Sequence, residues 1–108
     1  MPNTHNIFAD LPAAALPNEL IETLVKKNNV KIERIVSTGQ TTPVGEWYAQ
    51  DADEFVILLQ GAAELTFEDE QTSRLNAGDY LHIPAHCKHR VSWTEPTEVC
   101  VWLAVHFS

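Results

Sequence analysis

Cysteine is scarce in this chain, and long apolar runs are missing. The two cysteines, Cys87 and Cys100, lie thirteen residues apart with no CxxC pair, which excludes a disulfide framework and favours reduced thiols. The N-terminal segment lacks the basic start and apolar centre of a secretion signal. No apolar run approaches the length of a membrane-spanning helix. We therefore expect a soluble cytoplasmic protein.

Basic residues are also few. The 108-residue chain has 15 acids against 7 Lys and Arg, a formal charge of −8, and residues 46–70 hold eight acids and no Lys or Arg. Nucleic-acid affinity depends on neutralising phosphates with Lys and Arg, and anionic membrane surfaces attract basic segments. The composition therefore argues against both partners. The length fits one domain with a single core.

The first 29 residues are expected to form an arm and one short helix. Residues 1–17 contain three prolines and are predicted to be irregular, with a short apolar patch that packs onto the domain. Asn18 is a suitable N-cap, acids follow it, and two lysines and two asparagines come after the last apolar residue. The expected apolar stripe of this helix is Leu20, Ile21, Leu24 and Val25.

From Val30 to the C-terminus the pattern predicts a β domain. Short apolar or alternating segments are separated by Gly, Pro and Asp, as is typical of a sandwich or barrel. Residues 70–79 are expected to be a loop. The predicted strands cover residues 30–37, 46–50, 54–61, 62–69, 80–85, 89–94 and 98–107.

Two spacings in this region resemble the motifs of the cupin superfamily. Glu54 is followed by six residues and Gly61, as in the second half of the first motif, G-x5-H-x-H-x3-4-E-x6-G. Gly78 is followed by five residues and Pro84, and His89 stands at the histidine of the second motif, G-x5-P-x-G-x2-H-x3-N. The resemblance covers roughly residues 40–105. It implies a jelly-roll barrel, with Glu54 and His89 pointing inward, and a homodimer.

The first motif departs from the family at its two histidines. Tyr48 and Gln50 stand at these positions in one register, and Trp47 and Ala49 in the other. In cupins, three histidines and the glutamate usually bind one divalent metal. The departure therefore leaves two of the four usual ligands missing.

Two kinds of site remain open from the residues alone. The first is a divalent-metal site for Zn, Fe, Ni or Mn, in a barrel that could carry oxygenase or isomerase chemistry. Its ligands would be Glu54, His89, His86 and Gln50. The second is a metal-free barrel that binds a small organic molecule, with Glu54 and His89 bonded to each other. Whether the protein is an enzyme stays open, and so does a third possibility, a solid barrel that binds a partner protein.

Three aromatic residues are candidates for the wall of a ligand pocket in either case. They are Trp47, Tyr48 and Trp93. Trp102 is a further aromatic for which a pocket wall and plain core both stay open, and His106 is expected to be structural. The bases Lys88 and Arg90 flank His89, and strand alternation predicts that Arg90 faces away from the barrel interior.

Overall fold

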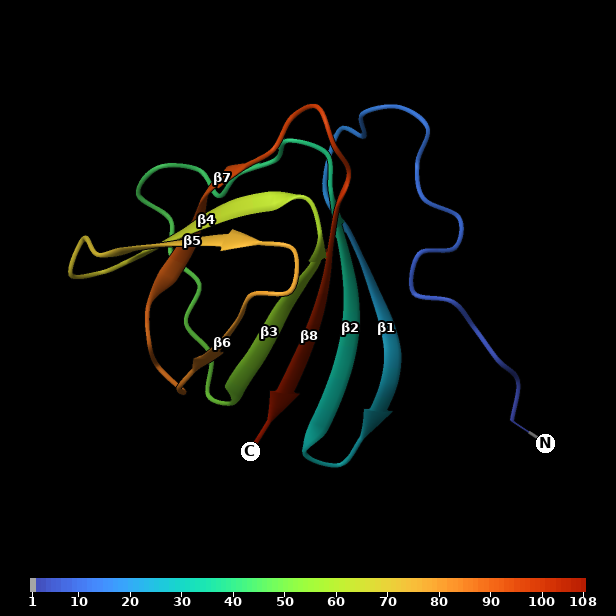
Figure 1. Cartoon of the computed structure of the whole chain (residues 1–108). Helices are drawn as coiled ribbons and strands as arrows, with labels where there is room; N and C mark the ends of the chain where they lie inside the picture. Colours follow the sequence, from blue (N-terminus) through green and yellow to red (C-terminus); the bar gives the residue numbers. More distant parts are fainter. Residues whose placement is uncertain (1) are drawn as a thin grey trace.

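A computed structural model describes residues 2–108. These residues form eight strands (Figure 1). The apolar, β-branched segments of the sequence form the strands, and the Gly, Pro and Asn positions form the turns between them. The strands are β1 (Leu20–Lys27), β2 (Val30–Ser37), β3 (Asp53–Gln60), β4 (Ala62–Phe67), β5 (Thr72–Asn76), β6 (Tyr80–Ile83), β7 (His89–Thr94) and β8 (Cys100–Phe107).

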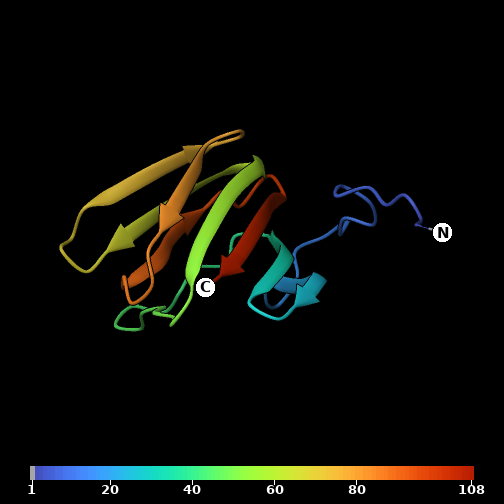
Figure 2. The ribbon, with the colours of Figure 1, turned by 90° about the horizontal axis from the view of Figure 1, so that it is seen from below.

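The strands make two antiparallel sheets that face each other (Figures 1 and 2). The larger sheet has the order β1-β2-β8-β3-β6 and the smaller has the order β5-β4-β7. Their inner faces enclose the core, which includes Leu58 and Trp102 from the large sheet and Leu65 and Leu75 from the small one. This arrangement is the expected jelly-roll barrel.

Gly61 makes the tight turn between β3 and β4. Its φ is +94°, and a Cβ added there would lie 2.5 Å from Sγ and 3.0 Å from Cα of Cys100. Only glycine fits such a close approach in this backbone conformation. The turn therefore fixes the end of the strand that carries Glu54.

The predicted helix is wrong, because residues 20–27 form strand β1. β1 pairs with β2 from Leu20↔Val36 to Lys27↔Val30, and Asn28, at φ +43°, lies in the turn between them. A register shift between Thr23 and Val25 interrupts the alternation of side chains. The interrupted alternation gives the apolar residues a spacing that resembles a helical stripe.

Two further expectations about the strands need correction. Residues 70–79 are not a loop throughout, because Thr72–Asn76 form β5 and pair with β4. Residues 46–50 are not a strand but a loop with one isolated bridge, Tyr48↔His89. This bridge nevertheless brings the loop alongside β7, where it closes one end of the barrel.

The N-terminal arm packs on the outside of the large sheet. The guanidinium of Arg34 on β2 donates to the carbonyls of Ile7 and Ala9 at 3.0 and 2.6 Å. The amide of Leu16 donates to Oγ1 of Thr38 at 2.9 Å. Residues 2–108 include no helix of the length and apolarity needed to cross a membrane.

Candidate functional site

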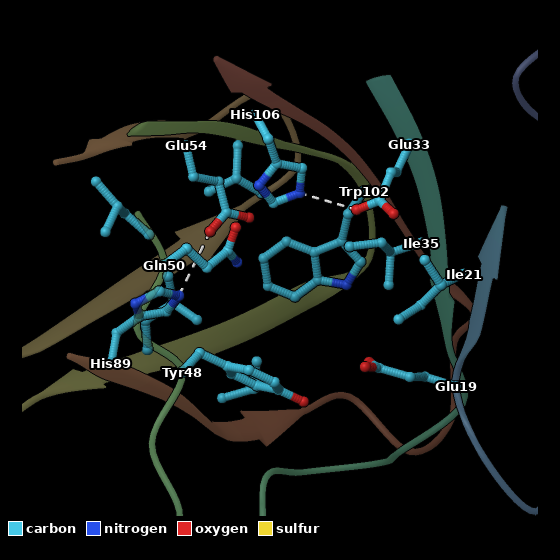
Figure 3. A pocket seen from close by; sticks show the side chains of 14 residues that line it. Glu19, Ile21, Glu33, Ile35, Tyr48, Gln50, Glu54, His89, Trp102 and His106 are labelled. Carbon is cyan, nitrogen blue, oxygen red and sulfur yellow. Dashed lines mark hydrogen bonds and ion pairs between the residues drawn. The ribbon is translucent and has the colours of Figure 1, made fainter. Parts of the chain in front are cut away.

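A cavity of about 120 Å³ lies between the two sheets (Figure 3). Its walls combine apolar side chains with acids and imidazoles. The polar lining residues are Glu19, Glu33, Tyr48, Gln50, Glu54, His89 and His106. The remaining lining residues are Ile21, Ile35, Val56, Leu65, Ile83, Val91 and Trp102. The barrel is therefore hollow at this end, which argues against the solid barrel of the third possibility.

Glu54 and His89 meet inside the cavity, as the motif spacings predict. Glu54 lies near the start of β3 in the large sheet, and His89 begins β7 in the small sheet. Nε2 of His89 lies 3.4 Å from Oε1 of Glu54. Both side chains are largely buried, so the pair joins the two sheets across a region of low dielectric.

The backbone fixes which nitrogen of His89 faces Glu54. Nδ1 lies 2.9 Å from the carbonyl oxygen of Cys87, and a carbonyl only accepts hydrogen bonds, so Nδ1 carries a hydrogen. Burial acts to lower the pKa of His89. The hydrogen bond to Glu54, the Cys87 carbonyl and the charge of Glu54 act in the opposite direction and leave this pKa raised.

A second acid–imidazole pair lies within the large sheet. Nε2 of His106 on β8 donates to Oε1 of Glu33 on β2 at 2.8 Å, and both residues are buried. Nζ of Lys31 lies 3.4 Å from the other oxygen of Glu33. Nδ1 of His106 is buried and has no hydrogen-bond partner among the described residues.

The loop before β3 supplies the floor of the cavity in Figure 3. Tyr48 and His89 exchange both backbone hydrogen bonds, at 2.7 and 3.0 Å, which holds the side chains of Tyr48 and Gln50 toward the cavity. Burial raises the pKa of Tyr48, and the charge of Glu19 raises it further, although a hydrogen bond to Thr42 acts to lower it. Burial also raises the pKa of Glu19.

The structure thus brings together four of the seven predicted site residues. Tyr48, Gln50, Glu54 and His89 line the cavity. His86 does not: its side chain is 73% exposed, and Nδ1 lies 3.6 Å from Oδ1 of Asp51. Its φ of +67° belongs to the turn between β6 and β7, which carries its side chain to the rim.

The two tryptophans of the predicted pocket also lie outside the cavity. Trp47 is adjacent to Tyr48 but does not line the cavity, and it is 38% exposed. For Trp93 the reason is a bulge in β7: Leu65 pairs with Val91 and Glu64 with Trp93, so Ser92 is an extra residue. The bulge turns Trp93 out, against Arg74, whose guanidinium carbon lies 4.3 Å from the ring centroid.

The residues at the site do not complete the predicted divalent-metal set. Among residues 2–108, no group of three or more His, Cys, Asp or Glu side chains gathers closely enough to hold a metal ion. His89 and Glu54 offer two strong donors, and the amide oxygen of Gln50 is a weak one. Zinc sites in proteins use at least three protein ligands.

Sequence reasoning missed Glu19 and Glu33, expected His106 to be structural, and left Trp102 open between a pocket wall and plain core. Trp102 and His106 lie on β8, Glu33 lies on β2, and Glu19 directly precedes β1. They reach the same cavity because β1, β2 and β8 are neighbours in the large sheet. The alternation of side chains along β8 was the pattern from which the positions of Trp102 and His106 could have been predicted. Trp102, Ala104 and His106 share one face of that strand, and Trp102 is a buried aromatic of the same face.

Comparisons with known proteins agree with this architecture. The family model described as "Cupin domain" matches residues 35–106. A structure from Ralstonia eutropha JMP134, described as a candidate mannose-6-phosphate isomerase, is 45% identical, with a TM-score of 0.94 and 99% coverage of both chains. A cupin superfamily protein from Desulfitobacterium hafniense DCB-2 is 23% identical, with a TM-score of 0.77, covering 99% of this chain and 94% of the other, and shares the fold.

One curated relative is similar in sequence. The uncharacterized protein YdbB of Bacillus subtilis (strain 168) is 31% identical over 94 residues, which cover 81% of this chain and 80% of that protein. The family model alone spans well over half of the chain and includes both strands of the Glu54–His89 pair. The chain therefore belongs to the cupin family.

Proposed function

We propose that this cupin binds one small organic molecule inside its barrel without a resident metal. The observation that carries the proposal is the convergence of polar side chains from both sheets, among them Glu54, His89, His106 and Tyr48, on one cavity that apolar side chains otherwise line. Ligand sites in proteins combine apolar walls with a few placed polar groups in this way. Glu54 and His89 would anchor the ligand as a pair, because the carboxylate of Glu54 keeps free acceptor sites while His89, whose two ring nitrogens face Cys87 and Glu54, holds that carboxylate in place.

The size of the cavity limits the ligand. Its volume of about 120 Å³ is slightly below the roughly 150 Å³ of an engineered cavity that binds benzene. The ligand should therefore have about six non-hydrogen atoms or a longer part that projects through the opening.

A sugar phosphate is not supported, although the R. eutropha protein is described as a candidate mannose-6-phosphate isomerase. Proteins recognise phosphate with Arg, Lys or a helix N-terminus. The cavity lining contains neither Lys nor Arg, and the described residues form no helix. Three carboxylates line the cavity instead, and they would repel a phosphate group.

A fragment-binding experiment tests the proposal. Molecules of up to about six non-hydrogen atoms are added to ¹⁵N-labelled protein, and shifts are expected for the amides of Tyr48 and His89 and the indole of Trp102. Val91→Phe fills the cavity and should abolish these shifts. Val44→Phe places the same side chain at a residue that is 89% exposed, and it should preserve them. Equal binding by both variants would contradict the proposal.

Metal analysis tests the other half of the proposal. Protein purified without an affinity tag is analysed for Zn, Fe, Ni and Mn, alongside the His89→Ala variant. We expect less than about a tenth of an equivalent in both, because two strong donors do not complete a closed site. A near-stoichiometric metal that is lost in the variant would overturn the metal-free proposal and support the metal site predicted from the sequence. The homodimer and the cytoplasmic location stay predictions.

A further inference from the structure

We propose that the ligand is a small organic cation, an ammonium or amidinium group on a short carbon chain, and that Nδ1 of His106 is one of the acceptors that select it. The inference rests on the proposed function, since it names the class of molecule that the same cavity takes. Three features support it: the orientation of one imidazole, the balance of charge and the aromatic walls.

The Glu33–His106 pair determines what His106 offers to a ligand. Oε1 of Glu33 accepts the Nε2 hydrogen at 2.8 Å, and in the neutral imidazole the other nitrogen is then an acceptor. That nitrogen, Nδ1, is buried and has no partner among the described residues. Glu54 is the cross-strand partner of His106, and Nδ1 faces the Glu54 side of the cavity in Figure 3. A ligand N–H placed between them would satisfy acceptors on both residues.

The charges around the cavity favour a cation. Glu19, Glu33 and Glu54 line it, while no Lys or Arg among residues 2–108 does. The ammonium of Lys31 lies 3.4 Å from the second carboxylate oxygen of Glu33, and its side chain is 42% exposed. The three carboxylates and Lys31 leave a formal charge of −2, or −1 with His89 protonated, so the cavity is negative in either state. The raised pKa values of Tyr48 and His89, to which the carboxylates contribute, are consistent with this negative field.

The aromatic residues of the cavity suit the same ligand. Nε1 of Trp102 donates to Oγ of Ser37 at 3.2 Å, so its only donor is already used and the indole can present its face. The indole lies near the centre of the cavity, with Tyr48 on one side of it (Figure 3). A cation held within about 6 Å of such a ring gains attraction from the ring quadrupole. Carboxylates and an aromatic face together distinguish an ammonium from an alcohol of the same shape.

A series of three probes of matched size tests the charge preference. n-Butylammonium, 1-butanol and butyrate are titrated into the protein at pH 7 and low ionic strength, and the shifts of cavity amides give their affinities. We expect butylammonium to bind at least about tenfold more tightly than butanol, a difference of about 1.4 kcal/mol, and butyrate to bind most weakly. Equal affinity for the amine and the alcohol would overturn the cation inference while leaving the proposed function intact. If neither these probes nor the neutral fragments bind, both proposals fail.

Glu33→Gln tests the part assigned to His106. The glutamine amide can donate to Nε2, which would move the ring hydrogen to Nδ1 and turn the acceptor into a donor. We expect the preference for butylammonium over butanol to fall by about fivefold to tenfold, and the ¹⁵N shifts of the His106 ring to report the exchanged tautomer.

Controls separate this effect from a change in fold. Glu98→Gln removes one negative charge at an exposed position outside the cavity and should leave the preference unchanged. Glu54→Gln removes a cavity charge without touching the Glu33–His106 bond and should also reduce the preference, which keeps the inference testable if Glu33→Gln does not fold. A tautomer that exchanges with no loss of preference would exclude His106 as a selecting acceptor.

Discussion

The two acid–imidazole pairs of the cavity present opposite nitrogens to it. In the Glu54–His89 pair the backbone carbonyl of Cys87 binds Nδ1, and Nε2 faces the carboxylate across the two sheets at 3.4 Å. In the Glu33–His106 pair the carboxylate binds Nε2 at 2.8 Å within one sheet, and Nδ1 has no partner among the described residues. His89 therefore has two supports that are independent of each other, whereas His106 depends on Glu33 alone.

Because of this difference, we expect the two pairs to have different roles in stability and in ligand binding. Loss of Glu54 would leave His89 oriented by Cys87, with Nε2 open to the cavity. Loss of Glu33 would leave both ring nitrogens of a buried imidazole without a protein partner. We infer that the Glu33–His106 pair contributes more to stability and that the Glu54–His89 pair is freer to respond to a ligand.

The largest expected effect is on the free energy of unfolding. Glu33→Ala should lower it by about 3 kcal/mol, because removal of one partner of a buried pair leaves the other uncompensated. Glu54→Ala should lower it by about 1 kcal/mol, because His89 keeps its bond to Cys87 and can become neutral. Urea denaturation at pH 7 measures both values. A larger loss in Glu54→Ala than in Glu33→Ala would reverse the assignment of the two pairs.

The same two pairs show how far the sequence predicts the site. Glu54 and His89 stand at motif spacings that place both in the barrel, whereas the motif leaves two registers open before Glu54, and the structure has Tyr48 and Gln50 lining the cavity. Glu33 and His106 are 73 residues apart, and no local pattern relates them. They meet because β2 and β8 are neighbours in the sheet, which is a consequence of the whole topology.

Two of the errors, the helix expected at residues 20–27 and the pocket position expected for Trp93, have a common physical cause in β-bulges. An extra residue in β7 reverses the alternation before Trp93, and a register shift in β1 gives an edge strand the apolar spacing of a helix. A bulge is decided by strand pairing as well as by the residues that form it. The jelly-roll fold was nevertheless predictable, because most strand segments and turns are read from local composition and the motifs supply their order.

An intermediate effect is expected on the titration of His89. Glu54→Gln removes the partner whose hydrogen bond and charge raise the pKa of His89, so this pKa should fall, and NMR titration of the imidazole carbons measures it. Glu33→Gln should change it much less, because Glu33 is not among the groups that shift it. A fall of the same size in both variants would show that the two pairs titrate as one system.

The stability of the protein should follow this titration. Because the folded-state pKa of His89 lies above its ordinary value of 6.5, the protonated imidazole stabilises the fold. This contribution is fully present below about pH 6.5 and is lost as the pH rises through the folded-state pKa. The free energies of unfolding of the parent and of Glu54→Gln, measured by urea denaturation, should therefore differ most near about pH 5.5 and converge at higher pH. A difference that grows with pH would contradict the sign of the shift.

The smallest expected effect is that of a substitution at His86. The comparison with His89 tests which of these two histidines belongs to the site. His86 is a rim residue whose Nδ1 lies 3.6 Å from Oδ1 of Asp51, and it belongs to neither acid–imidazole pair. His86→Asn keeps a side chain that tolerates positive φ, and it should change stability by less than about 0.5 kcal/mol and leave fragment affinities unchanged. His89→Asn in the same assays should reduce ligand affinity by about tenfold or more, because it removes one polar anchor of the cavity and leaves Glu54 unpaired. Equal losses of affinity in the two variants would place His86 in the site after all and restore the ligand set predicted from the sequence.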